Sequence, residues 1–116
     1  MIDDNMTLTS LSRELFLGFV KAHILYHAGR EAVYGLWLIE ELARHGYELS
    51  PGTLYPILRK LEEEGLLASE KQVVQGKARK YYRLTAAGQE ALERVREKAV
   101  ELLDEIREDT SPSRPD

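Results

Sequence analysis

The chain contains no cysteine, which excludes disulfides and thiolate metal sites. No apolar run approaches the ~20 residues that a membrane-spanning helix needs. The first residues, Met-Ile-Asp-Asp-Asn-Met, lack the cationic and apolar regions of a secretory signal peptide. We therefore expect a cytoplasmic protein with no membrane partner. Its 116 residues suit one domain with a single core.

The signatures of catalysis are missing as well. No nucleophile is paired with a base, and there is no glycine-rich phosphate loop and no metal-binding triad. His23 and His27 lie one helical turn apart, a spacing that suits two metal ligands, but Glu31 is not an obvious third. Two histidines at this spacing in an apolar helix are more often packing partners. We predict no enzymatic activity, no metal site and no cofactor.

Basic residues are outnumbered by acidic ones overall, but they are concentrated in one segment. The net charge is −4, which argues weakly against nucleic-acid binding. Residues 50–85, however, hold seven Lys/Arg against four Asp/Glu, whereas residues 1–49 and 86–116 are net acidic. Because the local potential at a contact surface governs attraction to phosphate, this segment is the candidate for contact with DNA.

The spacing of apolar residues predicts three helices in the first 65 residues of the chain. The first begins near Ser10 or Ser12 and ends near Ala28-Gly29-Arg30, where the glycine suits a left-handed cap. The second runs from about Ala32 to Arg44, and Gly46 ends it. Its predicted inner face is Leu36, Ile39, Leu42 and Ala43.

The third helix starts at Ser50, an N-cap followed by Pro51 at the first helical position, and Gly65 stops it. Its predicted inner face is Leu54, Ile57, Leu58 and Leu61. Pro56 lies inside this helix, where we expect a kink or a loosened first turn.

Two strands and a long helix complete the expected fold. Residues 66–73 and 79–84 predict a hairpin joined at Gln75-Gly76, and Thr85 caps a last helix that runs to about Arg107. Strand alternation places Tyr82 and Leu84 inside and leaves Tyr81 with its flanking arginines exposed. The predicted class is mainly α with a small β-hairpin: a flexible N-terminus 1–9, a winged helix-turn-helix domain 10–85, a C-terminal dimerisation helix 86–108 and a disordered tail 109–116.

The helix at 50–65 and the hairpin carry the candidate DNA contacts. The first turn of a helix offers free N–H groups to phosphate, and hydroxyl groups and cations nearby add donors and charge. The candidates are Ser50, Thr53, Tyr55, Arg59, Lys60, Lys77, Arg79, Lys80 and Tyr81. The alternatives are a plain amphipathic helix and a solvated cationic edge that prevents pairing between sheets. The order and spacing of the two elements favour the DNA interpretation.

Residues of about 32–92 resemble the PadR family of bacterial transcriptional regulators. The matching motifs are Tyr34-Gly35, Gly46-Tyr47, Ser50-Pro51-Gly52-Thr53-Leu54-Tyr55-Pro56, Leu61-Glu62-Glu63-Glu64-Gly65-Leu66, Arg79-Lys80-Tyr81-Tyr82 and Leu84-Thr85 through Gly88. The resemblance implies a winged helix-turn-helix homodimer that usually represses nearby genes. It also implies that helix 50–60 enters the major groove and that the wing touches the backbone or minor groove. The single long C-terminal helix matches the short-chain branch of the family.

A second surface is expected to join two copies of the chain. Apolar residues of the last helix recur at spacings of three and four, as in a coiled coil. This apolar stripe is too long to be covered by one small domain. The apolar first helix is its expected partner. The predicted dimerisation residues are Leu15, Phe19, Leu92, Val95, Ala99, Leu102 and Ile106. The alternative is that both helices belong to one core. A two-fold dimer presents two reading helices, so we expect an inverted-repeat operator.

Aromatic residues allow two interpretations. Phe16, Tyr26 and Trp37 would line a pocket for a small aromatic effector between subunits, as the resemblance implies, or would pack in the core, which the residue types favour. The function predicted from the sequence is a sequence-specific DNA-binding regulator, a homodimeric repressor that such an effector would release. The alternative function is a winged-helix module that binds proteins and not DNA.

Overall fold

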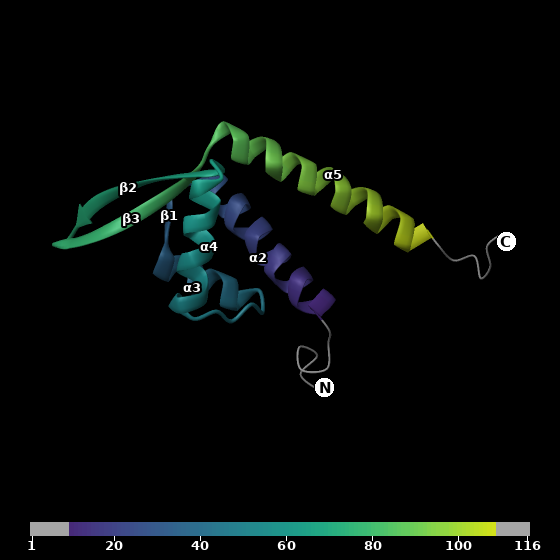
Figure 1. The fold of residues 1–116 in the computed structure, drawn as a ribbon, viewed down its shortest axis with the longest axis horizontal. Coiled ribbons are helices and arrows are strands. Elements are labelled where there is room, and N and C mark those ends of the chain that lie inside the picture. The colour runs from purple at the N-terminus through teal and green to yellow at the C-terminus, as the bar shows by residue number, and fades with distance from the viewer. Residues whose placement is uncertain (1–9, 109–116) are drawn as a thin grey trace.

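The computed structural model describes residues 10–108, so the expectations for 1–9 and 109–116 lie outside the described residues. The described part of the chain forms four helices and a three-stranded sheet. The order is α2 (Ser10–Arg30), β1 (Val33–Tyr34), α3 (Gly35–Arg44), α4 (Pro51–Glu63), β2 (Leu67–Val74), β3 (Lys77–Leu84) and α5 (Ala86–Glu108). The β2–β3 hairpin projects from one side of the molecule and α5 extends from the other (Figure 1). This is the mainly α class with a small hairpin that the sequence predicts.

Helix α2 ends where predicted, but not for the predicted reason. Val20, Ile24, Leu25 and Ala28 are buried and place one face of the helix in the core. Gly29 does not have the positive φ of a left-handed cap. Instead, a Cβ at Gly29 would come within 2.9 Å of Leu84 Cδ2. Glycine therefore allows α2 to approach the base of the hairpin.

The second helix begins three residues later than predicted because Val33 and Tyr34 form a strand. This short strand pairs with β3, with Val33 opposite Tyr82 and Tyr34 opposite Tyr81, and gives the sheet order β1-β3-β2. The predicted inner face is wrong at Leu36, which is 57% exposed, and Ala43 is also exposed. Leu38 and Leu42 are the fully buried residues of α3. Pairing of β1 fixes how the chain enters α3 and so which side of the helix faces the core.

Helix α4 follows its sequence signals closely. Ser50 caps it by accepting a hydrogen bond from the Thr53 N–H at 3.3 Å, and Pro51 is the first helical residue. Leu54, Leu58 and Leu61 are buried at spacings of four and three, and Ile57 is partly buried. The assigned helix is continuous through Pro56 to Glu63. Gly65 then takes φ 81° and turns the chain into β2.

The hairpin closes through the predicted two-residue turn. Gln75 and Gly76 have φ of 52° and 78°, and the two positive values are typical of a type I′ turn. Val74 lies opposite Lys77, and the pairing runs without interruption to Leu67 opposite Leu84. The second strand thus starts two residues earlier than predicted. We call residues 67–84 the wing.

Helix α5 is held to the domain at its start and is exposed along its later turns. The Thr85 hydroxyl donates to the Gly65 carbonyl at 2.6 Å and accepts from the Gly88 N–H at 3.0 Å. Gly88 contacts the Leu66 carbonyl so closely that a Cβ would not fit, and it is the only buried residue of the helix. The later turns of α5 leave the domain (Figure 1). Their large apolar side chains are exposed: Val95, Val100, Leu102, Leu103 and Ile106.

Candidate nucleic-acid interface

The N-terminal turn of α4 is an exposed surface with a hydroxyl pair at its edge. The Ser50 hydroxyl lies 3.4 Å from that of Thr53, in addition to capping the helix. Ser50 is therefore engaged within the chain, whereas Thr53 sits on the solvent side of the first turn. Ser50 accepts hydrogen bonds from the N–H groups of Thr53 and Leu54, so what favours phosphate at this end is the positive end of the helix dipole.

Tyr55 projects from α4 toward the start of α3. Its hydroxyl end lies against Gly35, where a Cβ would collide with the phenol. The ring remains 41% exposed. Tyr55 lines a groove together with three cations of the wing: Lys77, Arg79 and Lys80. The structure thus brings one candidate contact of α4 beside three candidates of the wing.

Tyr34 of β1 organises the cationic side of this groove. The Arg79 guanidinium lies 4.3 Å from the centre of the Tyr34 ring, a cation–π distance. Tyr81 packs edge-on against the same ring at 5.3 Å. Arg79 and Tyr81 are therefore half-buried, and the expectation that both are exposed is wrong. The cause is β1, because the paired strand places an aromatic ring beside them.

Most wing and α4 cations are not neutralised by neighbouring acids. Lys80 lies 3.8 Å from Glu62, which also accepts a hydrogen bond from Ser69 at 2.6 Å. Within residues 10–108, the candidate cations without an ion pair are Arg59, Lys60, Lys77 and Arg79. Glu62 thus faces the wing, and the charge of the other four cations remains available for phosphate.

The predicted dimerisation residues fall on two exposed apolar faces. On α2, Leu15 and Phe19 are each 52% exposed. On α5, Val95, Ala99, Leu102 and Ile106 are exposed, whereas Leu92 is partly buried against the core of its own chain. Apolar surface on this scale along two helices is typical of a protein–protein contact.

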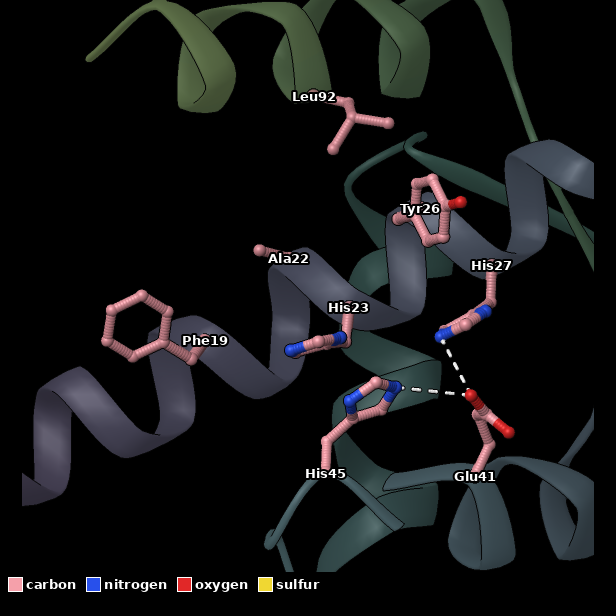
Figure 2. A pocket seen from close by; sticks show the side chains of 8 residues that line it. All are labelled: Phe19, Ala22, His23, Tyr26, His27, Glu41, His45 and Leu92. Carbon is pink, nitrogen blue, oxygen red and sulfur yellow. Dashed lines mark hydrogen bonds and ion pairs between the residues drawn. The ribbon is translucent and has the colours of Figure 1, made fainter. Parts of the chain in front are cut away.

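The three aromatic residues predicted for an effector pocket have different surroundings in the described part of the chain. Phe16 packs edge-on against Tyr47 at 5.3 Å, and Trp37 packs against the His27 ring at 5.4 Å. Both are partly buried against the core. Tyr26 lines a separate surface pocket between α2, α3 and the start of α5 (Figure 2).

Sequence reasoning missed a histidine in that pocket. His45, the C-cap residue of α3, lies 4.6 Å from His23 between ring centres, and Glu41 lies beside both His45 and His27 (Figure 2). Gly46, which follows His45 and has φ 92°, marks the end of α3. It does not indicate which residues the side chain of His45 contacts. Only the packing of α3 on α2 brings His45 to the pair.

Helices α3 and α4, followed by a two-stranded wing, define a winged helix-turn-helix protein. Over residues 10–108, no helix is long and apolar enough to cross a membrane.

Comparisons with known proteins identify the family. The Transcriptional regulator PadR-like family model matches residues 24–94. The chain is 52% identical over 94 residues to the transcriptional regulator Rv3488 of Mycobacterium tuberculosis, a match that covers 81% of this chain and 88% of that protein. The crystal structure of a PadR family regulator from Eggerthella lenta superposes with a TM-score of 0.75 at 38% identity, over 94% of this chain and 96% of that one.

A PadR-like regulator from Bacillus cereus gives a TM-score of 0.74 at 30% identity, over 81% of this chain and 93% of its own. The chain therefore belongs to the PadR-like family of transcriptional regulators. The names of the family and of these relatives are those of regulators and not of enzymes.

Proposed function

We propose that this protein is a DNA-binding transcriptional repressor that acts as a homodimer on an inverted-repeat operator. The observation that carries the proposal is the groove shared by Tyr55 of α4 and the wing cations Lys77, Arg79 and Lys80. A helix that presents its first turn beside a cationic hairpin can enter a major groove while the hairpin holds the neighbouring phosphates.

Roles in binding follow from chemistry and exposure. Arg59, Lys60, Lys77 and Arg79 are assigned to phosphate because they carry charge that no acid of the described residues neutralises. Thr53 and Tyr55 are assigned to the groove because both residues are exposed on α4 and Tyr55 lies beside the wing cations. Lys80 contributes less on this account, since Glu62 lies 3.8 Å away.

Dimerisation is proposed through α5 and α2. The exposed apolar residues of α5 extend well beyond the core of one chain and need a surface that covers them. The exposed face of α2 with Leu15 and Phe19 is an apolar surface of this kind. A two-fold pair would present two α4 helices to successive major grooves. An aromatic effector remains a prediction: Tyr26 lines the open pocket beside α2, whereas Phe16 and Trp37 are partly buried against the core.

The test is fluorescence anisotropy with two labelled duplexes across a series of salt concentrations. One duplex carries the region upstream of this protein's own gene and the other a scrambled sequence of equal length. The proposal predicts selective binding to the first that weakens steeply with salt. Absence of binding to either duplex would favour the alternative, a winged helix that binds protein partners.

A further inference from the structure

All three histidines of the chain meet in one place. His23 and His27 occupy successive turns of α2, and His45 reaches them from the end of α3 (Figure 2). One nitrogen from each ring lies within 4.8 Å of the others. Imidazole nitrogens around a tetrahedral ion at ~2.0–2.1 Å would stand about 3.3 Å apart, so the three rings would draw closer together to bind one ion.

A carboxylate lies beside two of the three histidines. Glu41 lies one turn before His45 on α3, and its Oε2 is 3.2 Å from His45 Nε2 and 3.7 Å from His27 Nε2. Its side chain is only 14% exposed. The three imidazoles are the groups that already lie together, and Glu41, beside His27 and His45, would supply a fourth ligand for a tetrahedral ion.

One ligand atom is buried without a partner. His27 Nε2 is inaccessible to solvent and makes no hydrogen bond within the described residues, since 3.7 Å to Glu41 is too long. A buried polar atom left unpaired destabilises the native state. An ion between His27 and Glu41 would satisfy the nitrogen and the carboxylate together.

Burial lowers the pKa of two of the rings. Burial, followed by the proximity of His45 and His27, lowers the pKa of His23. Burial also lowers the pKa of His27, although Glu41 acts in the opposite direction. A lower pKa favours the neutral imidazole, the form whose lone pair binds a metal, and so acts in the same direction as the geometry.

We propose that His23, His27, His45 and Glu41 form a binding site for a divalent transition-metal ion, with Zn²⁺ as the reference ion. The donor set of three nitrogens and one oxygen selects this class over Ca²⁺ and Mg²⁺, which prefer oxygen ligands. The pocket opens at the surface between Phe19, Tyr26 and Leu92, which gives the ion a route in.

The site joins the helix-turn-helix to the helices proposed for dimerisation. Two ligands come from α2 and two from the C-terminal turn of α3, which leads through Gly46 to the cap of α4. An ion bound here would therefore fix the position of α3 and α4 relative to α2. Any effect on DNA affinity rests on the proposed function, whereas binding of the ion does not.

The experiment uses the full chain, purified without a histidine tag and stripped with a chelator. Zn²⁺ is titrated in competition with a chromophoric chelator, and Co²⁺ is added separately to report coordination through its visible absorption. We expect one ion per chain, with the intense visible bands of four-coordinate Co²⁺, and a rise in the melting temperature of the protein because the ion binds only the native state.

Matched variants locate the site. His45→Ala removes a ligand that is 44% exposed and should weaken Zn²⁺ binding about 100-fold, while Glu41→Gln should weaken it ~10–100-fold. The control is Glu40→Gln, an equal charge change at the exposed neighbouring position, which should leave binding unchanged. Melting curves of the stripped variants establish that each is folded. Failure of the wild type to bind either ion, or equal binding by His45→Ala and the wild type, would overturn the proposal.

Discussion

The phenol of Tyr55 rests directly against the α-carbon of Gly35, in space that no side chain at position 35 could share. This contact joins the first residue of α3 to the exposed face of α4 and sets the direction in which Tyr55 points. Tyr55 also lines the groove that contains Lys77 and Arg79. Position 35 is therefore a glycine because the ring of Tyr55, a proposed DNA contact, occupies the space of a side chain there.

Gly35→Ala should displace Tyr55 and weaken operator binding by about tenfold or more, in keeping with the ~1–3 kcal/mol of a groove contact. Stability should change less, because the ring that must move is partly exposed. The measurement is anisotropy with the operator duplex, beside a thermal melt. Tyr55→Ala provides the control: in that background Gly35→Ala should cost little more, as in a double-mutant cycle. Additive effects of the two substitutions would show that Gly35 acts independently of Tyr55.

Leu102→Glu should break the proposed dimer, because it places a carboxylate in the exposed apolar seam of α5. Sedimentation velocity should then report a monomer whose circular dichroism is that of a folded protein. The matched control is Val73→Glu, since Val73 is a 74% exposed residue of the wing, and this variant should still sediment as a dimer. A dimer that survives Leu102→Glu would mean that α5 is not the contact.

The free energy of unfolding at alkaline pH should depend on Tyr82, a residue of β3 whose side chain is buried in the core. Burial, followed by Glu62 and Tyr55, raises the pKa of its phenol above the usual value of about 10. In the unfolded chain the phenol ionises first, so the contribution to stability is complete below about pH 10 and is lost as pH rises further. Urea titrations on both sides of that pH should show a smaller decrease of unfolding free energy in Tyr82→Phe than in the wild type. Equal decreases would contradict this assignment.

Local signals predicted much of the fold. Ser50, Pro51 and Gly65 fix the ends of α4 through hydrogen bonds and backbone angles that involve only near neighbours, and Gln75-Gly76 sets the hairpin in the same way. Strand β1 gave no such signal. Its two residues become a strand only by pairing with Tyr81 and Tyr82, far along the chain, and this pairing also shifted the face of α3.

The proposed sites show the same division between local and distant causes. Candidate cations of α4 and the wing were visible in the sequence because they cluster along it. The half-burial of Arg79 and Tyr81 could not be predicted from the sequence, because it depends on the ring of Tyr34. Periodicity likewise paired His23 with His27, whereas His45 reaches them only when α3 packs on α2.

The central claim is that cations of the wing hold DNA phosphates, and the salt dependence of binding tests it most directly. The change is Lys77→Gln with Arg79→Gln, two residues without an ion pair in the described part of the chain. The control, Arg94→Gln with Arg107→Gln, removes equal charge from exposed positions of α5 outside its apolar seam.

Anisotropy titrations at several salt concentrations give the slope of log affinity against log salt for each protein. The account predicts that the wing variant binds more weakly and that its slope falls by about 1 for each phosphate that the substituted side chains no longer neutralise, while the control keeps the wild-type slope. A wing variant with the slope and affinity of the wild type would contradict the account.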